Sequence, residues 1–151
     1  MEPVSGQAYH RAMYQVTNQV GRLVEIAIWS PVLFEEAERW GREHDRVVDS
    51  VGQPYVCFVD LRGAKVFPPE TVAAYLSTMK AEQQLVRTAT LLPESALVAL
   101  QINRMIREAG HPERRPFSNA DELRHWLGEK LDEKERARLE QLLARPIHRE
   151  L

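Results

Sequence analysis

The chain has 151 residues with a formal net charge of −2, and 44% of its residues are hydrophobic and 28% charged. This length fits one domain with a sizeable core, and the composition excludes a mainly disordered chain. The net charge is too small to indicate a nucleic-acid or membrane partner by itself. We expect a cytoplasmic protein, because no basic segment precedes an apolar core and no run approaches the roughly 20 apolar residues of a membrane span. The single cysteine, Cys57, excludes an internal disulfide.

The first part of the chain predicts a hairpin followed by a helix. Residues 8–16 and 22–29 carry strand-forming residues on either side of a turn, so we expect them to pair as antiparallel strands. Ser30-Pro31 is typical of a helix start. Apolar residues, with His44 among them, then recur at three- and four-residue steps and predict a helix that ends at Gly52.

The middle of the chain predicts strands that alternate with helices. The continuous apolar run 55–60 indicates a central strand covered on both faces. Pro68-Pro69 begins a second helix, and residues 86–92 follow as another strand. A third helix begins at Pro93-Glu94-Ser95 and is closed by Gly110.

The last part predicts a short strand and two helices. Phe117 anchors the strand, and Ser118–Asp121 has the form of a capping box at the start of the fourth helix. Residues 132–145 predict a final helix with a narrow leucine stripe, which packs across the domain or pairs with a second copy. We assign residues 1–130 to one α/β domain and 131–151 to a C-terminal helical extension.

This order of elements predicts the fold class and the position of a site. Strands that alternate with helices favour an α/β fold: a mixed β-sheet of about five strands with helices packed on it, plus an extra C-terminal helix. The stretch from Tyr55 to Thr71 leads from the central strand through a turn to a helix N-terminus. In open α/β sheets, ligands and partners usually bind at the carboxyl ends of the strands, so we expect the interaction site there.

Two motifs resemble a known family. The segment VDLRGAKVFPPETVAAYL resembles STAS domains of the bacterial anti-sigma-factor antagonist type, in which a strand ending in Asp-Leu-Ser-Gly leads to Asp-Ser-Ser-Gly at a helix start. Asp60, Leu61 and Gly63 match the first motif. The tail RRPFSNADELRHWL resembles the STAS-like subgroup related to lipid-binding CRAL-TRIO proteins. The resemblance implies a STAS-like fold and a regulatory role in bacterial signalling.

The chain departs from this family at the switch serine. The segment Asp-Ser-Ser-Gly falls on Pro68, Pro69, Glu70 and Thr71, so Glu70 stands where the antagonists carry the phosphorylated serine. Glu70 either supplies a permanent negative charge or only stabilises the helix N-terminus. Thr71 is either a modification site or an ordinary polar residue of the first turn. A kinase switch at this position is therefore not expected.

The leading hypothesis is a non-enzymatic regulatory module that binds a protein partner or a second copy of itself. Its predicted contact residues surround the strand–helix junction: Asp60, Arg62, Lys65, Pro69, Glu70 and Thr71. The ordinary role of Asp60 is to accept backbone N–H bonds in the turn. The alternative hypothesis, from the subgroup resemblance, is a module that binds a lipid, a small apolar ligand or a membrane surface.

A second candidate site is a group of arginines that follows the third helix. Arg104, Arg107, Arg114 and Arg115 could form a patch for an anionic ligand such as an acidic partner, a lipid head group or a phosphate. The alternative is a solvated surface whose cations complement the helix C-terminus. Aromatic residues do not alternate with these arginines, so we expect no nucleic-acid partner.

Catalytic and cofactor motifs are not found in the sequence. Cys57 lies within a strand, where a thiolate is not favoured, and the five histidines show no metal-ligand spacing. The chain has no Gly-rich phosphate loop and no Gly-x-Ser-x-Gly elbow. We therefore expect no enzyme, no cofactor and no metal. A hydrolase or transferase would need a pocket that holds Asp60 or a histidine with a strongly shifted pKa.

Overall fold

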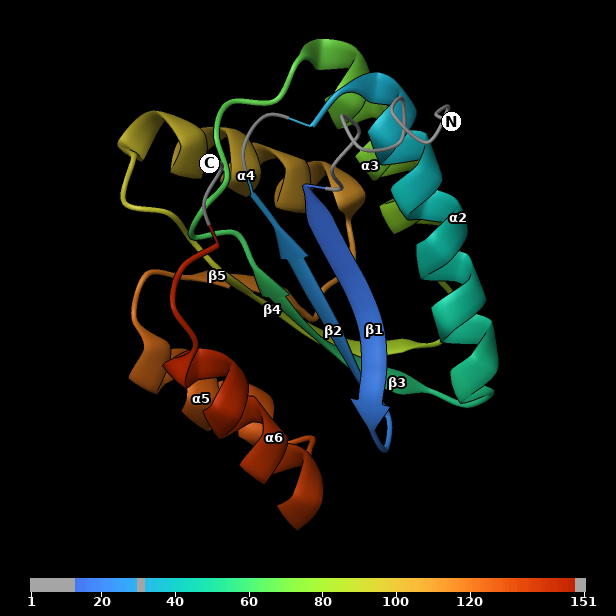
Figure 1. Ribbon diagram of the computed structural model, residues 1–151, viewed down its shortest axis with the longest axis vertical. Coiled ribbons are helices and arrows are strands. Elements are labelled where there is room, and N and C mark those ends of the chain that lie inside the picture. The colour runs from blue at the N-terminus through green and yellow to red at the C-terminus, as the bar shows by residue number, and fades with distance from the viewer. Residues whose placement is uncertain (1–12, 30–31, 149–151) are drawn as a thin grey trace, which may run out of the picture.

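The computed structural model describes residues 13–29 and 32–148. These residues form one five-stranded sheet with the strands in the order β1-β2-β3-β4-β5 (Figure 1). The strands are β1 (Tyr14–Val20), β2 (Leu23–Ile28), β3 (Tyr55–Asp60), β4 (Leu85–Leu91) and β5 (Arg114–Phe117). β1 pairs with β2 in antiparallel orientation, and every later pair is parallel. The predicted α/β fold with a mixed sheet is confirmed.

Helices cover both faces of the sheet (Figure 1). One face carries α2 (Phe34–Val51), α3 (Pro69–Ala81) and α4 (Ala96–Ala109), and the other carries α5 (Ala120–Gly128) and α6 (Glu133–Ala144). Alternate residues of β3 face the two layers: Tyr55 and Cys57 pack with the first group of helices, whereas Val56 and Phe58 pack with the second. A continuous apolar strand is needed because both of its faces are buried.

The predicted hairpin is present, and among the described residues its first strand extends beyond the predicted end at Val16. Residues 8–12 of the predicted strand lie outside the described residues, and β1 continues to Val20 through the position of the expected turn. The Asn18 amide donates to the carbonyls of Gly21 and Leu23, and a register shift follows Asn18. Residues 18–20, at the position of the expected turn, therefore belong to an edge strand. The side chain of Asn18 stabilises the hairpin through its two bonds to the chain that follows.

Most helix ends follow the predicted signals. α2 ends at Gly52, whose φ of 69° suits glycine, and α3 begins at Pro69. Ser95 accepts a hydrogen bond from the Val98 N–H at the start of α4. The predicted start of α2 at Ser30-Pro31 lies outside the described residues, and α2 begins at Phe34.

The capping-box prediction was wrong for α5. Its N-cap is Asn119 and not Ser118, because the Asn119 Oδ1 accepts from the N–H groups of Asp121 and Glu122. A reciprocal capping box occurs instead at α6, between Asp132 and Glu135.

The final helix packs against its own sheet. Leu139 and Leu142 of α6 are buried together with Leu23 and Val56 of the sheet and Leu123 of α5. Of the two arrangements expected for this helix, the structure shows the one in which it lies across the domain. Among the described helices, none has the length and apolar character needed to cross a membrane.

Candidate functional site

Asp60 and Arg62 of the predicted junction form an ion pair. Asp60 is buried and accepts hydrogen bonds from the Arg62 backbone N–H at 3.1 Å, from its Nε at 3.0 Å and from its Nη2 at 2.8 Å. Asp60 thus takes the turn-stabilising role that aspartates often have at such positions, and its charge is neutralised by the adjacent guanidinium.

The C-terminal segment 145–148 covers part of this junction, and it runs beside the β3–α3 loop in Figure 1. The Arg62 Nη2 also donates to the Arg145 carbonyl. Trp29 stacks on His148 with ring centroids 4.4 Å apart. Gly63 lies so close to His148 that a Cβ at this position would be 2.0 Å from its carbonyl oxygen.

The remaining predicted contact residues divide into buried and exposed ones. Thr71 is fully buried and donates to the Val32 carbonyl at 2.8 Å. Lys65, Pro69 and Glu70 are exposed. The exposed part of the predicted surface is therefore limited to the end of the loop and the first turn of α3.

The four arginines of the predicted anion patch do not lie on one surface. The Arg114 side chain is only 6% exposed and lies on the α2–α3–α4 side of the sheet, where it binds Glu82. The guanidinium of its neighbour Arg115 lies 4.6 Å from the centroid of Trp126, a residue of α5 on the opposite side. Arg104 and Arg107 are exposed on α4.

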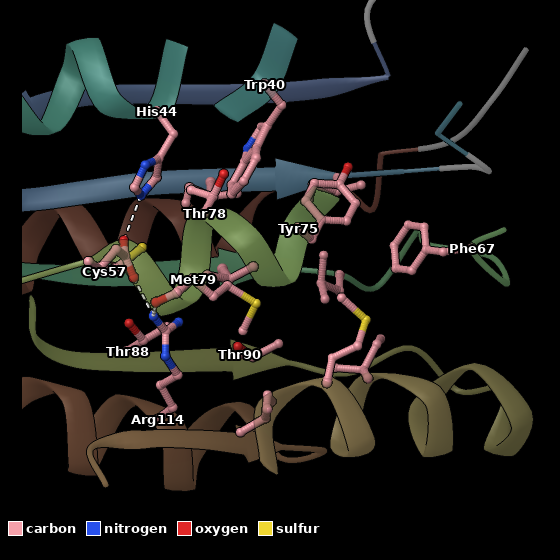
Figure 2. A pocket seen from close by; sticks show the side chains of 18 residues that line it. Trp40, His44, Cys57, Phe67, Tyr75, Thr78, Met79, Thr88, Thr90 and Arg114 are labelled. Carbon is pink, nitrogen blue, oxygen red and sulfur yellow. Dashed lines mark hydrogen bonds and ion pairs between the residues drawn. The ribbon is translucent and has the colours of Figure 1, made fainter. Parts of the chain in front are cut away.

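A cavity of about 80 Å³ lies between the sheet and helices α2, α3 and α4. Figure 2 shows Trp40 and His44 entering from one side and Arg114 from the opposite side. Tyr75 packs edge-on against Trp40 at 4.9 Å and against Phe67 at 5.4 Å, measured between ring centroids. Most of the remaining wall is apolar: Ile26, Ile28, Val59, Leu61, Met79, Ile102, Met105 and Ile106.

One end of the cavity is polar, and Glu82 is at its centre. The Glu82 Oε1 lies 2.6 Å from the His44 Nε2 and accepts a hydrogen bond from the Tyr55 hydroxyl at 2.5 Å. Its Oε2 accepts from the Arg114 Nη2, which also donates to the Met79 carbonyl. The Glu82 and Arg114 side chains are only 8% and 6% exposed.

Burial and pairing act against each other on the acid–base groups of this cluster. Burial alone would raise the pKa of Glu82, but the His44 hydrogen bond and the Arg114 charge outweigh it and hold that pKa below its usual value. Burial alone would lower the pKa of His44, but Glu82 and Asp45 raise it overall. Burial raises the pKa of the Cys57 thiol, so Cys57 stays protonated.

A second, more open hollow of about 400 Å³ adjoins the polar end. It lies at the amino ends of β3 and β4, and its lining is mainly polar. His44, Thr78 and Glu82 line both spaces. These three residues therefore stand between the apolar cavity and an outer polar groove.

Three buried donors around the cavity make no hydrogen bond among the described residues: Trp40 Nε1, Tyr75 OH and Arg114 Nε. Buried polar atoms are nearly always paired in folded proteins. Unpaired donors around an apolar cavity are suited to a ligand that carries a hydrogen-bond acceptor.

This cluster was not predicted from the sequence. His44, Tyr55, Glu82 and Arg114 come from four separate parts of the chain, so no local spacing connects them. The one available signal was His44, a titratable residue on the apolar stripe of its predicted helix. Among the described residues, no group of three or more potential metal ligands is found.

No protein-family model and no curated protein matches this chain. The resemblance to STAS domains thus stays a prediction from the two motifs.

Proposed function

We propose that this protein is a non-enzymatic binding module whose cavity between the sheet and α2, α3 and α4 takes a small, largely apolar molecule. The observation that carries this proposal is the cavity itself, which has apolar walls, a polar end and an adjoining groove. Pockets of this kind, apolar with a few placed polar groups, are the usual form of small-molecule sites.

The size of the cavity limits the ligand. Its volume of about 80 Å³ is smaller than the roughly 150 Å³ of an engineered cavity that binds benzene. The ligand is therefore narrow, or the side chains of Met79 and Met105 move to admit it. Methionine side chains adapt readily because they are unbranched and flexible.

The chemistry of the lining favours binding over reaction. Cys57 is a protonated thiol, and both ring nitrogens of His44 are engaged by carboxylates. Glu82 already has three hydrogen-bond donors. These groups hold one another in place, and none is positioned as a free base or nucleophile.

Saturation-transfer NMR with hexanol as the probe tests this proposal. Thr90 lines the cavity, so Thr90→Leu should fill part of it and weaken hexanol binding by about tenfold or more. Thr90→Val, which has nearly the same volume as threonine, is the matched control and should bind like the wild type. Equal signals from all three proteins, or none from the wild type, would refute the proposal.

A second candidate function is the regulatory protein-interaction module that the STAS resemblance implies. It is favoured by exposed apolar side chains on the loop and on α4: Val66, which follows Lys65, is 46% exposed, and Leu97 and Leu100 of α4 are 67% and 52% exposed. The Gln101 side chain binds the N–H and the carbonyl of Phe67, which holds the loop beside α4. Apolar side chains within a charged rim are typical of protein interfaces.

A quantitative pull-down from an extract of the source organism tests this surface. Val66→Asp and Glu70→Lys should each weaken the recovery of a bound protein by roughly tenfold, since they alter the centre and the rim of the surface. Lys134→Glu, an exposed change on α6, is the control. Recovery that is the same for all variants, with unchanged circular dichroism, counts against this surface.

A further inference from the structure

We infer that the molecule bound in the cavity carries one carboxylate, which binds Arg114 at the polar end while its apolar body lies among the remaining wall residues. This inference rests on the proposed function and names the class of ligand: small apolar monocarboxylates. The charges and the hydrogen bonds of the cluster around Glu82 support it.

His44 is a cation in this arrangement. Its Nε2 lies 2.6 Å from the Glu82 Oε1 and its Nδ1 lies 3.1 Å from the Asp45 Oδ1. An ionised carboxylate only accepts hydrogen bonds, and an imidazole donates from both nitrogens only when it is protonated. Both contacts are hydrogen bonds only if His44 carries a positive charge.

The buried charges of the polar end do not balance. Two cations, His44 and Arg114, meet one buried carboxylate, Glu82, and no other acidic side chain among the described residues lines the cavity. The Asp45 carboxylate is 71% exposed, so water screens its charge. His44 and Arg114 therefore share one buried anion, and a ligand carboxylate would give them a second one inside the cavity.

The hydrogen bonds of Arg114 point to the same group. Its Nη2 is used by Glu82 and by the Met79 carbonyl, whereas its Nε has no partner among the described residues. Carboxylates are the preferred partners of the guanidinium donors of arginine. A ligand carboxylate therefore supplies both a second buried anion and an acceptor for the Arg114 Nε.

Other ligand head groups fit less well. A neutral carbonyl or hydroxyl would accept from Arg114 but would leave Glu82 as the one buried anion for both cations. An amine would add a third cation to the cluster. The apolar wall and the volume of about 80 Å³ limit the rest of the molecule to a short or compact hydrocarbon.

Isothermal titration calorimetry at neutral pH with hexanoate, hexanol and hexylamine tests the inference on the wild-type protein. The three probes share one chain and differ only in the head group. Hexanoate should bind at least about tenfold more tightly than hexanol, and hexylamine should bind more weakly than either.

Two variants then test the role of the charges. Arg114→Lys keeps a cation for Glu82 but loses the Nε donor, and His44→Gln removes one cation while keeping a donor toward Glu82. Each should reduce the preference for hexanoate over hexanol to less than about threefold. If either variant fails to fold, the other variant and the wild-type series still decide.

The outcomes separate this inference from the proposed function. Equal affinity for hexanoate and hexanol would overturn the carboxylate assignment and leave the apolar-ligand proposal standing. A preference for hexanoate that survives in both variants would place the carboxylate elsewhere and also overturn it. No binding of any probe would overturn both proposals.

Discussion

Glu82 is the residue on which the polar end of the cavity depends. It accepts hydrogen bonds from Tyr55 and Arg114 and pairs with His44, and its side chain is only 8% exposed. A buried carboxylate is tolerated only when such partners offset its loss of hydration. Its removal would leave Arg114 without its ion-pair partner and His44 with only the exposed Asp45.

Glu82→Gln should therefore destabilise the protein strongly, although it preserves the shape of the side chain. Breaking a buried ion pair from one side costs about 3–5 kcal/mol, and we expect a loss in this range in urea unfolding. Glu70→Gln is the control, because Glu70 is an exposed residue of the first turn of α3, where such a charge contributes about 0.3–1 kcal/mol. Similar losses for both variants would contradict the central role of Glu82.

The same cluster predicts how stability depends on pH. The pKa of Glu82 is lowered in the folded state from 4.5, so its contribution is present above pH 4.5 and is lost as the pH falls through the folded value. The pKa of His44 is raised from 6.5, so its contribution is complete below pH 6.5 and is lost as the pH rises through the folded value. The free energy of unfolding should thus be highest between these two values.

Urea unfolding over a series of pH values checks this expectation. In His44→Gln the alkaline decline should shrink, whereas the acid decline should persist because Arg114 still pairs with Glu82. An alkaline decline of the same size in this variant would show that His44 is not its source.

At the scale of elements, the sequence predicted those features that depend only on neighbouring residues of one strand or helix. The apolar run of β3, the double proline at the start of α3 and the glycine after α2 each act on their own neighbours, and the structure has those elements at the predicted places. The polar cluster could not be predicted in this way, because it joins α2, β3, β5 and the residue after α3. The cover over the β3–α3 loop likewise comes from residues 145–148, far along the chain.

Gly63→Ala tests the contact between that loop and the C-terminal segment. A Cβ at residue 63 would lie 2.0 Å from the His148 carbonyl oxygen, so the segment has to move. We expect a cost of about 1–3 kcal/mol, as for other overpacked sites, and a change in Trp29 fluorescence because its stacking on His148 is lost. Gly128→Ala is the control: the nearest heavy atom to its added Cβ is 3.6 Å away. An unchanged Trp29 signal in Gly63→Ala would show that the segment does not pack there.

At the scale of the whole molecule, the sheet separates two layers with different roles. The α5–α6 layer is fixed to the sheet by fully buried leucines and by Arg138, whose guanidinium donates to both oxygens of Glu25 at 2.7 and 2.8 Å. The α2–α3–α4 layer contains the cavity. We therefore expect the first layer to support the fold and the second to bind the ligand.

Paired truncations in the two layers test this division. Leu142 is fully buried in the α5–α6 layer, whereas Ile102 lines the cavity. Truncation of either to alanine should cost about 2–5 kcal/mol in urea unfolding.

The effects of these two truncations on ligand binding should differ. Leu142→Ala should leave hexanol affinity unchanged, because the sheet lies between this site and the cavity. Ile102→Ala enlarges the cavity and should shift the preference from hexanol towards the longer octanol. A change in probe affinity of the same size in both variants would mean that the two layers do not act independently.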